Sequence, residues 1–505
     1  MGNNAEFKGM VYLGFDLGSS SVKAALIDAA DGREIARAHA PESEMPIDAP
    51  HPGWAEQDPE AWWTHAVSAA RKLFSSAAIN PRDVGGIGIA YQMHGLVAVG
   101  EQQEVIRPSI IWCDSRAVQT GDALFEKVGP TVFAQRMLNH PGNFTLPKLL
   151  WVKENEPEQF KRIHKIMLPG DYLAMKLSGH ITTTSSGLSE GILWDFQQNT
   201  PAHWLLESCG LSTDLLPALV PTLGKQGELS AKAAAALGLP EGIPIAYRAG
   251  DQPNNALSLN VMEPGEVAAT GGTSGVVYAV SDKPDKDEIS RINQFAHVNH
   301  TAEAARIGKL LCINGTGIQY GWLRKLMGKK LSYNEMNARA SAVSPGSDGL
   351  SLLPFGNGAE RMLGNRFPGA SMHGIDFNRH NEDHLCRAAL EGIAFAFAYG
   401  MELMQDTAHF SKIRAGSDNL FQAAVFGDTL ATLSGARIEL VNTTGAIGAA
   451  RAAALACGNL ASLSEACATD SQEGLYLPQT DTSAIQEAYQ RWKQHLRNAL
   501  ENKSS

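Results

Sequence analysis

The stretch VYLGFDLGSSSVKAALID, residues 11–28, decides the fold that we expect for this chain of 505 residues. Two runs of apolar residues flank a tight turn of glycine and serine, and this pattern is typical of a β-hairpin. Asp16 stands at the end of the first run, directly before the turn. An aspartate there has an ordinary local explanation, because Asp and Gly are favoured in turns. It can also hold a hydrated Mg²⁺ while the amide and hydroxyl groups of the turn face phosphate oxygens.

A second stretch, EVAATGGTSGVVYAVSD at residues 266–282, repeats this design half a chain later. Gly272 lies 254 positions after Gly18, close to half of 505. We therefore expect a duplicated architecture with a boundary near residues 250–265, where Pro and Gly interrupt the chain. Two facing phosphate-binding hairpins would suit a nucleoside triphosphate between two domains.

The segments around the hairpins alternate between helical and strand patterns. Residues 58–77 predict an amphipathic helix with Asp58 as its cap, and residues 84–100 predict a buried strand pair. Residues 381–405 predict a long helix, and residues 445–458 predict a helix of small residues packed close to another element. This alternation indicates the α/β class.

Composition and charge narrow the class of protein. Apolar residues make up 44% and charged residues 19% of the chain, which is ordinary for a folded globular protein. The net charge of −11 disfavours nucleic acid as a main partner. The 6 cysteines form no CxxC pair, so neither a zinc knuckle nor a disulfide framework is indicated. We find no signal peptide and no membrane span, and we expect a cytoplasmic protein.

Asp251 is a second candidate for chemistry. It follows the apolar segment IPIAYRAG at residues 243–250, where burial could tune a carboxylate as a general base. A capping or turn aspartate is the plainer interpretation of the same pattern. The residues alone do not decide between the two.

A third candidate is a set of polar residues after strands of the first half. The set contains Gln92, Met93, His94, Trp112 and Asp114. Polyhydroxylated ligands are recognised by fixed hydrogen bonds beside an aromatic face, and strand ends of α/β sheets are where such ligands lie. A histidine after an apolar strand is more often structural, but several polar strand ends together favour a site.

Motifs of other protein classes have less support in this sequence. No Walker sequence is present, and no GxGxxG follows a strand, so P-loop and Rossmann folds lack support. GLSEG at residues 187–191 matches GxSxG and would make Ser189 a nucleophile, but the bulky segment that follows does not continue as the required helix. His373, His380 and His384 could suggest a metal site, but no zincin pattern surrounds them.

Taken together, the motifs resemble those of the FGGY family of carbohydrate kinases from about Val11 to Leu455. The resemblance rests on both hairpins, Gln92 to Gly95, Trp112 to Arg116 and Gly250-Asp251. Within the family the chain is most similar to the xylulokinase branch, because HPGWAEQDPEAWW at residues 51–63, the Met-His pair and WCDSR match that branch. Residues 374–391 also resemble the C-terminal signature of the family.

The resemblance implies an α/β fold of two ribonuclease H-like domains, of the type found in actin and hexokinase, with a cleft between them. We expect the domains to span residues 1–258 and 259–505. The implied activity is ATP-dependent phosphorylation of a small ketose at its terminal hydroxyl, D-xylulose first, with Mg²⁺. Ribulose, gluconate, glycerol or a related polyol is the alternative substrate, and a non-catalytic sugar sensor is the alternative class. The oligomeric state is undecided, and a homodimer stays open.

The resemblance also implies roles for individual residues. Asp251 corresponds to the catalytic base, and Asp16 is expected at the metal. The expected sugar-binding residues are Gln92, Met93, His94, Trp112, Asp114, Asp251 and Gln252. The expected nucleotide-binding residues are Gly18, Ser19, Ser20, Lys23, Gly272, Thr273, Ser274, Gly416, Ser417 and Asn419.

Two departures from the family pattern bear on these expectations. Many members have a turn of three glycines near the adenosine, whereas this chain reads RAGSDN at residues 414–419. Gln252 stands after the expected base where xylulokinases usually have Asn. The first departure affects the nucleotide contacts and the second affects the sugar preference.

Overall fold

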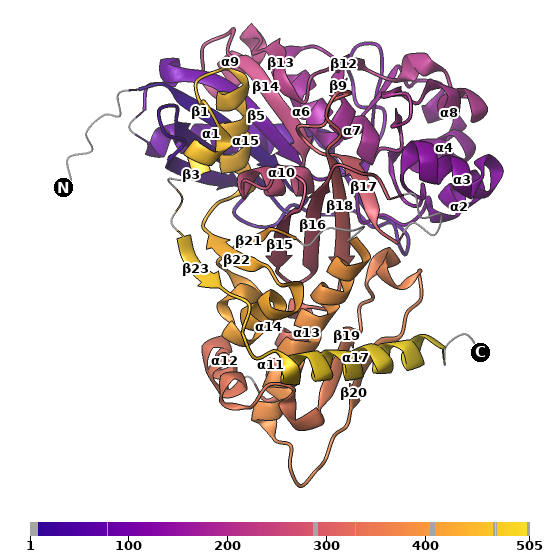
Figure 1. Ribbon diagram of the computed structural model, residues 1–505. Coiled ribbons are helices and arrows are strands. Elements are labelled where there is room, and N and C mark those ends of the chain that lie inside the picture. Colours follow the sequence, from indigo (N-terminus) through magenta and orange to yellow (C-terminus); the bar gives the residue numbers. More distant parts are fainter. Residues whose placement is uncertain are drawn as a thin grey trace.

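Two large sheets organise the computed structural model, which describes residues 9–77, 79–285, 291–328, 330–404, 410–467, 470 and 472–501 (Figure 1). The first sheet has 6 strands in the order β13-β14-β5-β1-β2-β3, and the second has 7 in the order β17-β18-β16-β15-β21-β22-β23. The strands of the first sheet are β1 (Val11–Leu17), β2 (Val22–Asp28), β3 (Glu34–Ala40), β5 (Val84–Tyr91), β13 (Leu223–Glu228) and β14 (Pro244–Gly250). Those of the second are β15 (Glu266–Gly271), β16 (Gly275–Ser281), β17 (Asn293–Ala296), β18 (Ile307–Ile313), β21 (Lys412–Gly416), β22 (Arg437–Val441) and β23 (Gln472–Tyr476).

The two sheets repeat one pattern of strand directions. β1 pairs antiparallel with β2 and parallel with β5, which pairs parallel with β14. β15 likewise pairs antiparallel with β16 and parallel with β21, which pairs parallel with β22. Both predicted hairpins are thus confirmed, and each occupies the same place in its own sheet.

The predicted helices are also confirmed. α1 (Pro59–Ser76) begins at a proline, and the Asp58 carboxylate accepts a hydrogen bond of 3.0 Å from the Glu60 amide. α13 (Glu382–Met404) is buried along most of its length, because most of its residues are small or apolar. α15 (Gly445–Ala456) consists mostly of glycine and alanine, so its backbone can approach other elements closely.

α15 crosses from the second half of the chain to the first sheet. It packs against β1, β5 and β14, and in Figure 1 this yellow helix lies among the indigo and violet strands. Small residues make the approach possible, because a Cβ atom on Gly14 would lie only 1.9 Å from the carbonyl oxygen of Ala446. α10 (Asp251–Ser258) makes the reciprocal crossing, since it follows β14 and contacts β15 and β16.

We predicted that residues 84–100 form two strands that pair with each other, and this pairing is wrong. Both strands form and both are buried, but β6 (Val97–Val99) pairs with β8 (Lys165–Met167) in a separate small sheet. The chain turns away after β5 at His94, whose φ of 63° lies in the left-handed region. A single non-glycine residue in that conformation redirects the strand.

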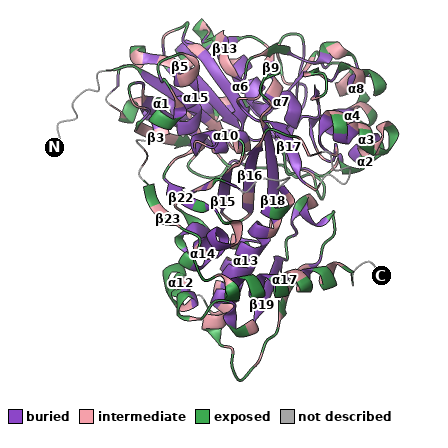
Figure 2. Cartoon of the chain, viewed as in Figure 1, coloured by how far each residue is buried: buried purple, intermediate pink, exposed green. Residues whose placement is uncertain are grey.

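Helices and small sheets extend the first sheet on one side. They include α2 (Val118–Val128), α4 (Thr145–Asn155), α6 (Pro169–Ser178), α7 (Ser185–Glu190) and α8 (His203–Ser208). Around the second sheet lie α11 (Gly317–Leu326), α12 (Tyr333–Ala342), α14 (Ala424–Ser434), α17 (Ser483–Glu501) and the hairpin of β19 (Ser351–Phe355) and β20 (Gly369–His373). Figure 2 shows that buried residues concentrate on the sheets and on α13 and α15. Among the described residues, no helix combines the length and apolarity needed to cross a membrane.

Candidate active site

The first hairpin presents Asp16 beside a tight turn. The Gly18 amide donates to the Ser21 carbonyl at 3.0 Å and closes the turn between β1 and β2. Asp16 lies opposite Lys23 in the β-register, and their charged atoms are 3.5 Å apart. The Asp16 carboxylate also faces the first residue of α15, because a Cβ on Gly445 would lie 2.8 Å from its Oδ2.

Asp251 lies at the first position of α10, directly after β14. Burial is the main cause that raises its pKa to about 7, and the negative charge of Asp16 is the second. Hydrogen bonds from Gln252 lower the pKa but do not cancel these effects. The two carboxylates predicted from the sequence thus lie near enough for one to influence the other.

Asp16 and its surroundings fit the implied Mg²⁺. In the described parts of the chain, no group of three or more His, Cys, Asp or Glu side chains could hold a metal ion, and the three histidines at 373, 380 and 384 form none. Mg²⁺ needs no such cage, because it keeps several waters and binds through one or two carboxylates plus substrate phosphates. Two neighbouring carboxylates that repel each other create the negative potential that a cation neutralises.

The second hairpin borders a large cavity. Gly272 and Thr273 line a cavity of about 710 Å³ together with residues of α11 and the segment from Asp418 to Leu420. The carbonyl oxygens of Gly272 and Thr273 accept hydrogen bonds from the first amides of α11, at 3.2 and 3.1 Å. The structure thus gathers three predicted nucleotide-binding residues, Gly272, Thr273 and Asn419, around one cavity large enough for a nucleotide.

The other predicted nucleotide-binding residues lie around the two turns. Ser19, Ser20 and Lys23 belong to the first turn and its flanking strand, where Ser20 and Lys23 are exposed. Ser274 lies in the second turn. Gly416 and Ser417 precede Asp418 but are not among the described residues that line the cavity, and the Ser417 hydroxyl donates to Glu473.

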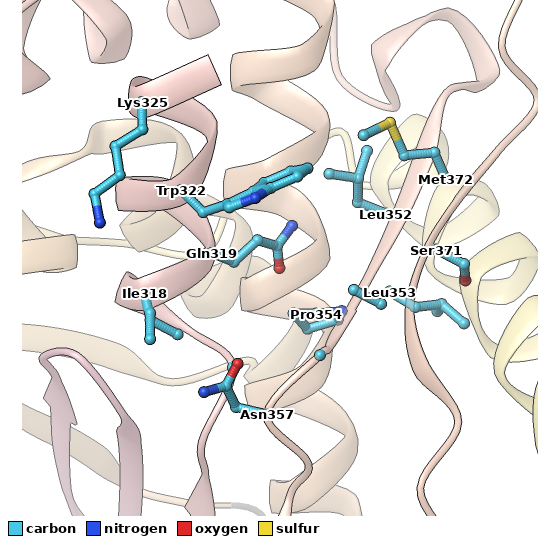
Figure 3. A pocket seen from close by; sticks show the side chains of 13 residues that line it. Ile318, Gln319, Trp322, Lys325, Leu352, Leu353, Pro354, Asn357, Ser371 and Met372 are labelled. Carbon is cyan, nitrogen blue, oxygen red and sulfur yellow. The ribbon is translucent and has the colours of Figure 1, made fainter. Parts of the chain in front are cut away.

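A second cavity of about 470 Å³ lies between α11 and the β19–β20 hairpin (Figure 3). Trp322, Leu352 and Met372 give it an apolar lining. Ile318 and Lys325 of α11 border both cavities. None of the predicted site residues lines this second cavity among the described residues.

Gln92 and Met93 connect the ends of three neighbouring strands. The Gln92 amide donates to the Leu17 carbonyl at 2.7 Å, so the chain after β5 is tied to the first hairpin. Met93 packs against the end of β14, because a Cβ on Gly250 would lie 2.6 Å from its Cγ. The residues after β5 therefore lie between Asp16 and Asp251.

His94 lies in an aromatic environment built from both halves of the chain. Its ring centroid is 4.4 Å from that of Phe144 and 5.4 Å from that of Phe295 in β17. Burial lowers the pKa of His94 to about 3, and the nearby positive charge of Lys148 adds to the effect. The imidazole is therefore neutral near pH 7.

Trp112 is exposed, whereas Asp114 is buried. Trp112 is 51% exposed, and its indole nitrogen donates to the Ser19 hydroxyl at 3.4 Å, so its ring borders the first turn. Asp114 is fully buried, and it accepts hydrogen bonds of 2.6 Å from the Ala55 amide and the Arg116 guanidinium. These bonds fix the loop that carries Trp112. The structure thus places Trp112 beside the first turn and keeps the Asp114 carboxylate inside the protein.

Two buried ionisable residues near His94 were not predicted from the sequence. Lys148 in α4 is fully buried, and its ammonium donates to the carbonyls of His94 and Ile111, at 2.8 and 3.1 Å. Burial lowers its pKa to about 7. Glu190 ends α7 and is 1% exposed. In the sequence, Lys148 stands between apolar residues and Glu190 stands in a segment rich in Ser and Gly, and neither pattern identifies a distant partner.

The chain is similar to known carbohydrate kinases in sequence and in structure. Residues 11–258 match the FGGY family of carbohydrate kinases, N-terminal domain. The chain is 31% identical over 489 residues to the xylulose kinase of Escherichia coli (strain K12), a match that covers 95% of this chain and 96% of that protein. The crystal structure of xylulose kinase from Rhodospirillum rubrum aligns with a TM-score of 0.87 at 26% identity, over 97% of this chain and 98% of that one.

The architecture is shared with a kinase named for another substrate. The crystal structure of gluconate kinase from Lactobacillus acidophilus aligns with a TM-score of 0.87 at 20% identity, over 98% of both chains. At that identity the likeness concerns the fold alone. These neighbours confirm the predicted α/β fold with two ribonuclease H-like domains, and they show that this fold by itself does not select a sugar.

Proposed function

The chain belongs to the FGGY family of carbohydrate kinases, and we propose that it transfers the terminal phosphoryl group of ATP to the terminal hydroxyl of D-xylulose, giving D-xylulose 5-phosphate. Relatives named xylulose kinase that align over nearly the whole chain support the choice of sugar. The observation that carries the chemistry is the pair formed by Asp16 and Asp251, in which the charge of one raises the pKa of the other.

Asp251 is the proposed general base. Phosphoryl transfer needs accurate positioning, charge stabilisation on the phosphate oxygens and a base for the attacking hydroxyl. A carboxylate with a pKa of about 7 suits this role, because a base is most effective when its pKa lies near the operating pH. It stands at the start of α10, directly after β14, and β14 neighbours β5 and then β1, at whose ends Gln92 and Asp16 lie.

ATP is proposed to occupy the cavity beside the second hairpin. Its adenosine would lie near Asn419 and α11, and its phosphates would reach the turns at Gly18 and Gly272. When bound, Mg²⁺ supplies positive charge that stabilises the negative charge of the transferring phosphoryl group. Asp16 would hold the ion, and Lys23 lies close enough to contribute a further positive charge.

We propose residues 1–258 and 259–505 as the two domains. Each of the two large sheets lies wholly within one of these segments. α10 and α15 connect them, so movement about these helices would bring the two turns together around ATP and sugar.

The proposed sugar site is formed by the residues after β5 and by the Trp112 loop. Met93 packs against Gly250 directly before the base, Gln252 follows the base in the chain, and His94 follows Met93. Trp112 offers an aromatic face beside the first turn. Asp114 would act by holding the Trp112 loop, because its carboxylate already receives hydrogen bonds from Ala55 and Arg116. A cytoplasmic location stays a prediction.

ADP release measured across a panel of sugars tests the proposed activity. The panel contains D-xylulose, L-ribulose, gluconate and glycerol, each with ATP and Mg²⁺. We expect D-xylulose to give the highest kcat/KM. A higher value for another member would move the assignment to that substrate, and sugar binding without any ADP release would favour a non-catalytic sensor.

A further inference from the structure

Glu190 holds His94 at two points. The His94 backbone N–H donates to Glu190 Oε2 at 3.2 Å, and His94 Nδ1 lies 3.0 Å from the Glu190 carbonyl oxygen. Glu190 belongs to the GLSEG segment at residues 187–191, and the α7 helix ends with it. This buried residue therefore contacts both the backbone and the ring of a proposed sugar-binding histidine.

The backbone conformation of His94 requires such support. Its φ of 63° lies in the left-handed region, which is strained for a residue other than glycine. The Glu190 carboxylate binds the amide of His94, and the Lys148 ammonium binds its carbonyl at 2.8 Å. The strained residue is thus fixed on both sides by buried side chains.

The contact at Nδ1 selects one form of the imidazole. A carbonyl oxygen can only accept a hydrogen bond, so the Glu190 carbonyl at 3.0 Å requires a proton on Nδ1. The ring is neutral, so Nε2 carries no proton and is a hydrogen-bond acceptor. In the described structure Nε2 makes no hydrogen bond with the protein. It is not buried away from solvent, and the His94 side chain is 15% exposed.

Glu190 also touches the segment that carries the proposed base. A Cβ on Gly250 would lie 3.2 and 3.3 Å from the two carboxyl oxygens of Glu190, and Asp251 follows directly. Burial raises the pKa of Glu190 well above its usual range, and the charge of Asp251 acts in the same direction. The Glu190 carboxyl group therefore lies against both His94 and the start of α10.

We infer that Glu190 is a positioning residue of the sugar site, which fixes His94 as the Nδ1-protonated tautomer so that Nε2 accepts a hydrogen bond from a sugar hydroxyl. The inference deepens the proposed function and rests on it for the identity of the ligand. It also predicts selectivity. A sugar that lacks the hydroxyl, or carries a methyl ether in its place, cannot donate to Nε2 and should bind less tightly.

Three variants separate positioning from general stability. Glu190→Gln keeps the size and an oxygen that can accept the hydrogen bond from the His94 N–H, so we expect the KM for sugar to stay within about threefold of wild type. Glu190→Ala removes the carboxyl group that accepts the hydrogen bond from the His94 backbone N–H, but it keeps the backbone carbonyl that contacts Nδ1. We expect the KM for sugar to rise at least about tenfold while the KM for ATP stays within about twofold. Ser189→Ala is the matched control, because Ser189 is equally buried in α7 and bonds to Ser186 and Ala296 instead.

Nitrogen NMR of histidine-labelled protein reads the tautomer without any turnover. The His94 signals are assigned by their loss in His94→Gln. We expect a neutral ring with the proton on Nδ1 in the full-length protein, and a shift of the Nε2 signal when the preferred sugar of the panel is added. A proton on Nε2, or an unchanged KM for sugar in folded Glu190→Ala, would overturn the inference. If no panel sugar is phosphorylated, the proposed function fails, while the tautomer is still measured.

Discussion

The side-chain amide of Asn254 donates a hydrogen bond of 2.9 Å to the backbone carbonyl of Gly445, 191 positions further along the chain. Asn254 lies in the first turn of α10, and Gly445 is the first residue of α15. Each helix follows the third parallel strand of its own sheet, β14 or β22, and crosses toward the other half. The hydrogen bond therefore joins equivalent helices of a duplicated architecture at the point where Asp16 and Asp251 meet.

Close packing of α15 on the first sheet should depend on glycine at position 14. In Gly14→Ala the new Cβ would lie 1.9 Å from the Ala446 carbonyl oxygen and 2.6 Å from the Ala450 nitrogen. Backbone atoms cannot yield as a flexible side chain does, so we expect the free energy of unfolding to fall by about 3 kcal/mol. Urea unfolding measures this loss.

Gly272→Ala is the matched control for stability. The nearest atom to its new Cβ is a carbonyl oxygen at 3.6 Å, which is an ordinary contact. Equal unfolding midpoints for Gly14→Ala and the wild type would mean that α15 does not pack against β1 as described.

Domain closure is the second prediction. The proposed nucleotide site borders the second hairpin, while the proposed sugar site borders the ends of β1, β5 and β14. Ligands bound to both should draw the two halves together. We expect small-angle X-ray scattering to report a smaller radius of gyration with D-xylulose and a non-hydrolysable ATP analogue than with either ligand alone. An unchanged radius would argue against a hinged kinase.

Local patterns predicted much of this fold. The hairpins, α1, α13 and α15 follow from residue periodicity, caps and small-residue runs, which are visible in one stretch of sequence. The spacing of 254 residues between the two glycine turns indicated the duplication. The pairing of β5 and β6 was predicted wrongly, because a left-handed turn at His94 separates strands that look continuous in sequence.

The site was predictable only in part, for a related reason. Asp16, Asp251 and Gln92 stand at strand ends, where the sequence pattern itself places them together. Glu190 and Lys148 act through partners 96 and 54 positions away, and no local pattern identifies such partners. Asp114 matched a sugar-site motif, but its acceptors are used by Ala55 and Arg116, which only the packed structure reveals.

Acid should destabilise the protein through His297, which is the third prediction. This residue is 1% exposed, and burial is the main cause that lowers its pKa to about 3. The unfolded chain binds a proton near pH 6.5, whereas the folded chain does not, so stability is lost as the pH falls below about 6.5. At pH 5, His297 should have lowered the free energy of unfolding by about 2 kcal/mol.

Urea unfolding at pH 7 and pH 5 checks this dependence. Between pH 7 and pH 5, the free energy of unfolding of His297→Gln should fall by about 2 kcal/mol less than that of the wild type. Replacement of the exposed His203 by Gln is the control and should leave the difference unchanged. Parallel losses in the wild type and His297→Gln would contradict the prediction.

Asp16 is expected to organise Mg²⁺ and phosphate, which is the fourth prediction. Asp16→Asn keeps the shape and removes the charge, so turnover should fall by orders of magnitude while sugar binding measured by calorimetry stays within a few-fold. Asp28→Asn is the control, because Asp28 lies at the other end of the same hairpin. Near-full turnover of Asp16→Asn at ordinary Mg²⁺ would make Asp16 only a turn residue.

The last prediction concerns Asp251 as the base that accepts the proton of the attacking hydroxyl. An alcohol is far too weak an acid to ionise unaided near pH 7, and a positioned base typically contributes about 10² to 10⁴ in rate. Asp251→Asn keeps the size of the side chain and its place at the start of α10 but cannot take the proton. We therefore expect kcat to fall at least about 10²-fold, while calorimetry still detects binding of ATP and D-xylulose. A folded variant that keeps more than about a tenth of the wild-type kcat, a smaller loss than a base should cause, would show that another residue accepts the proton.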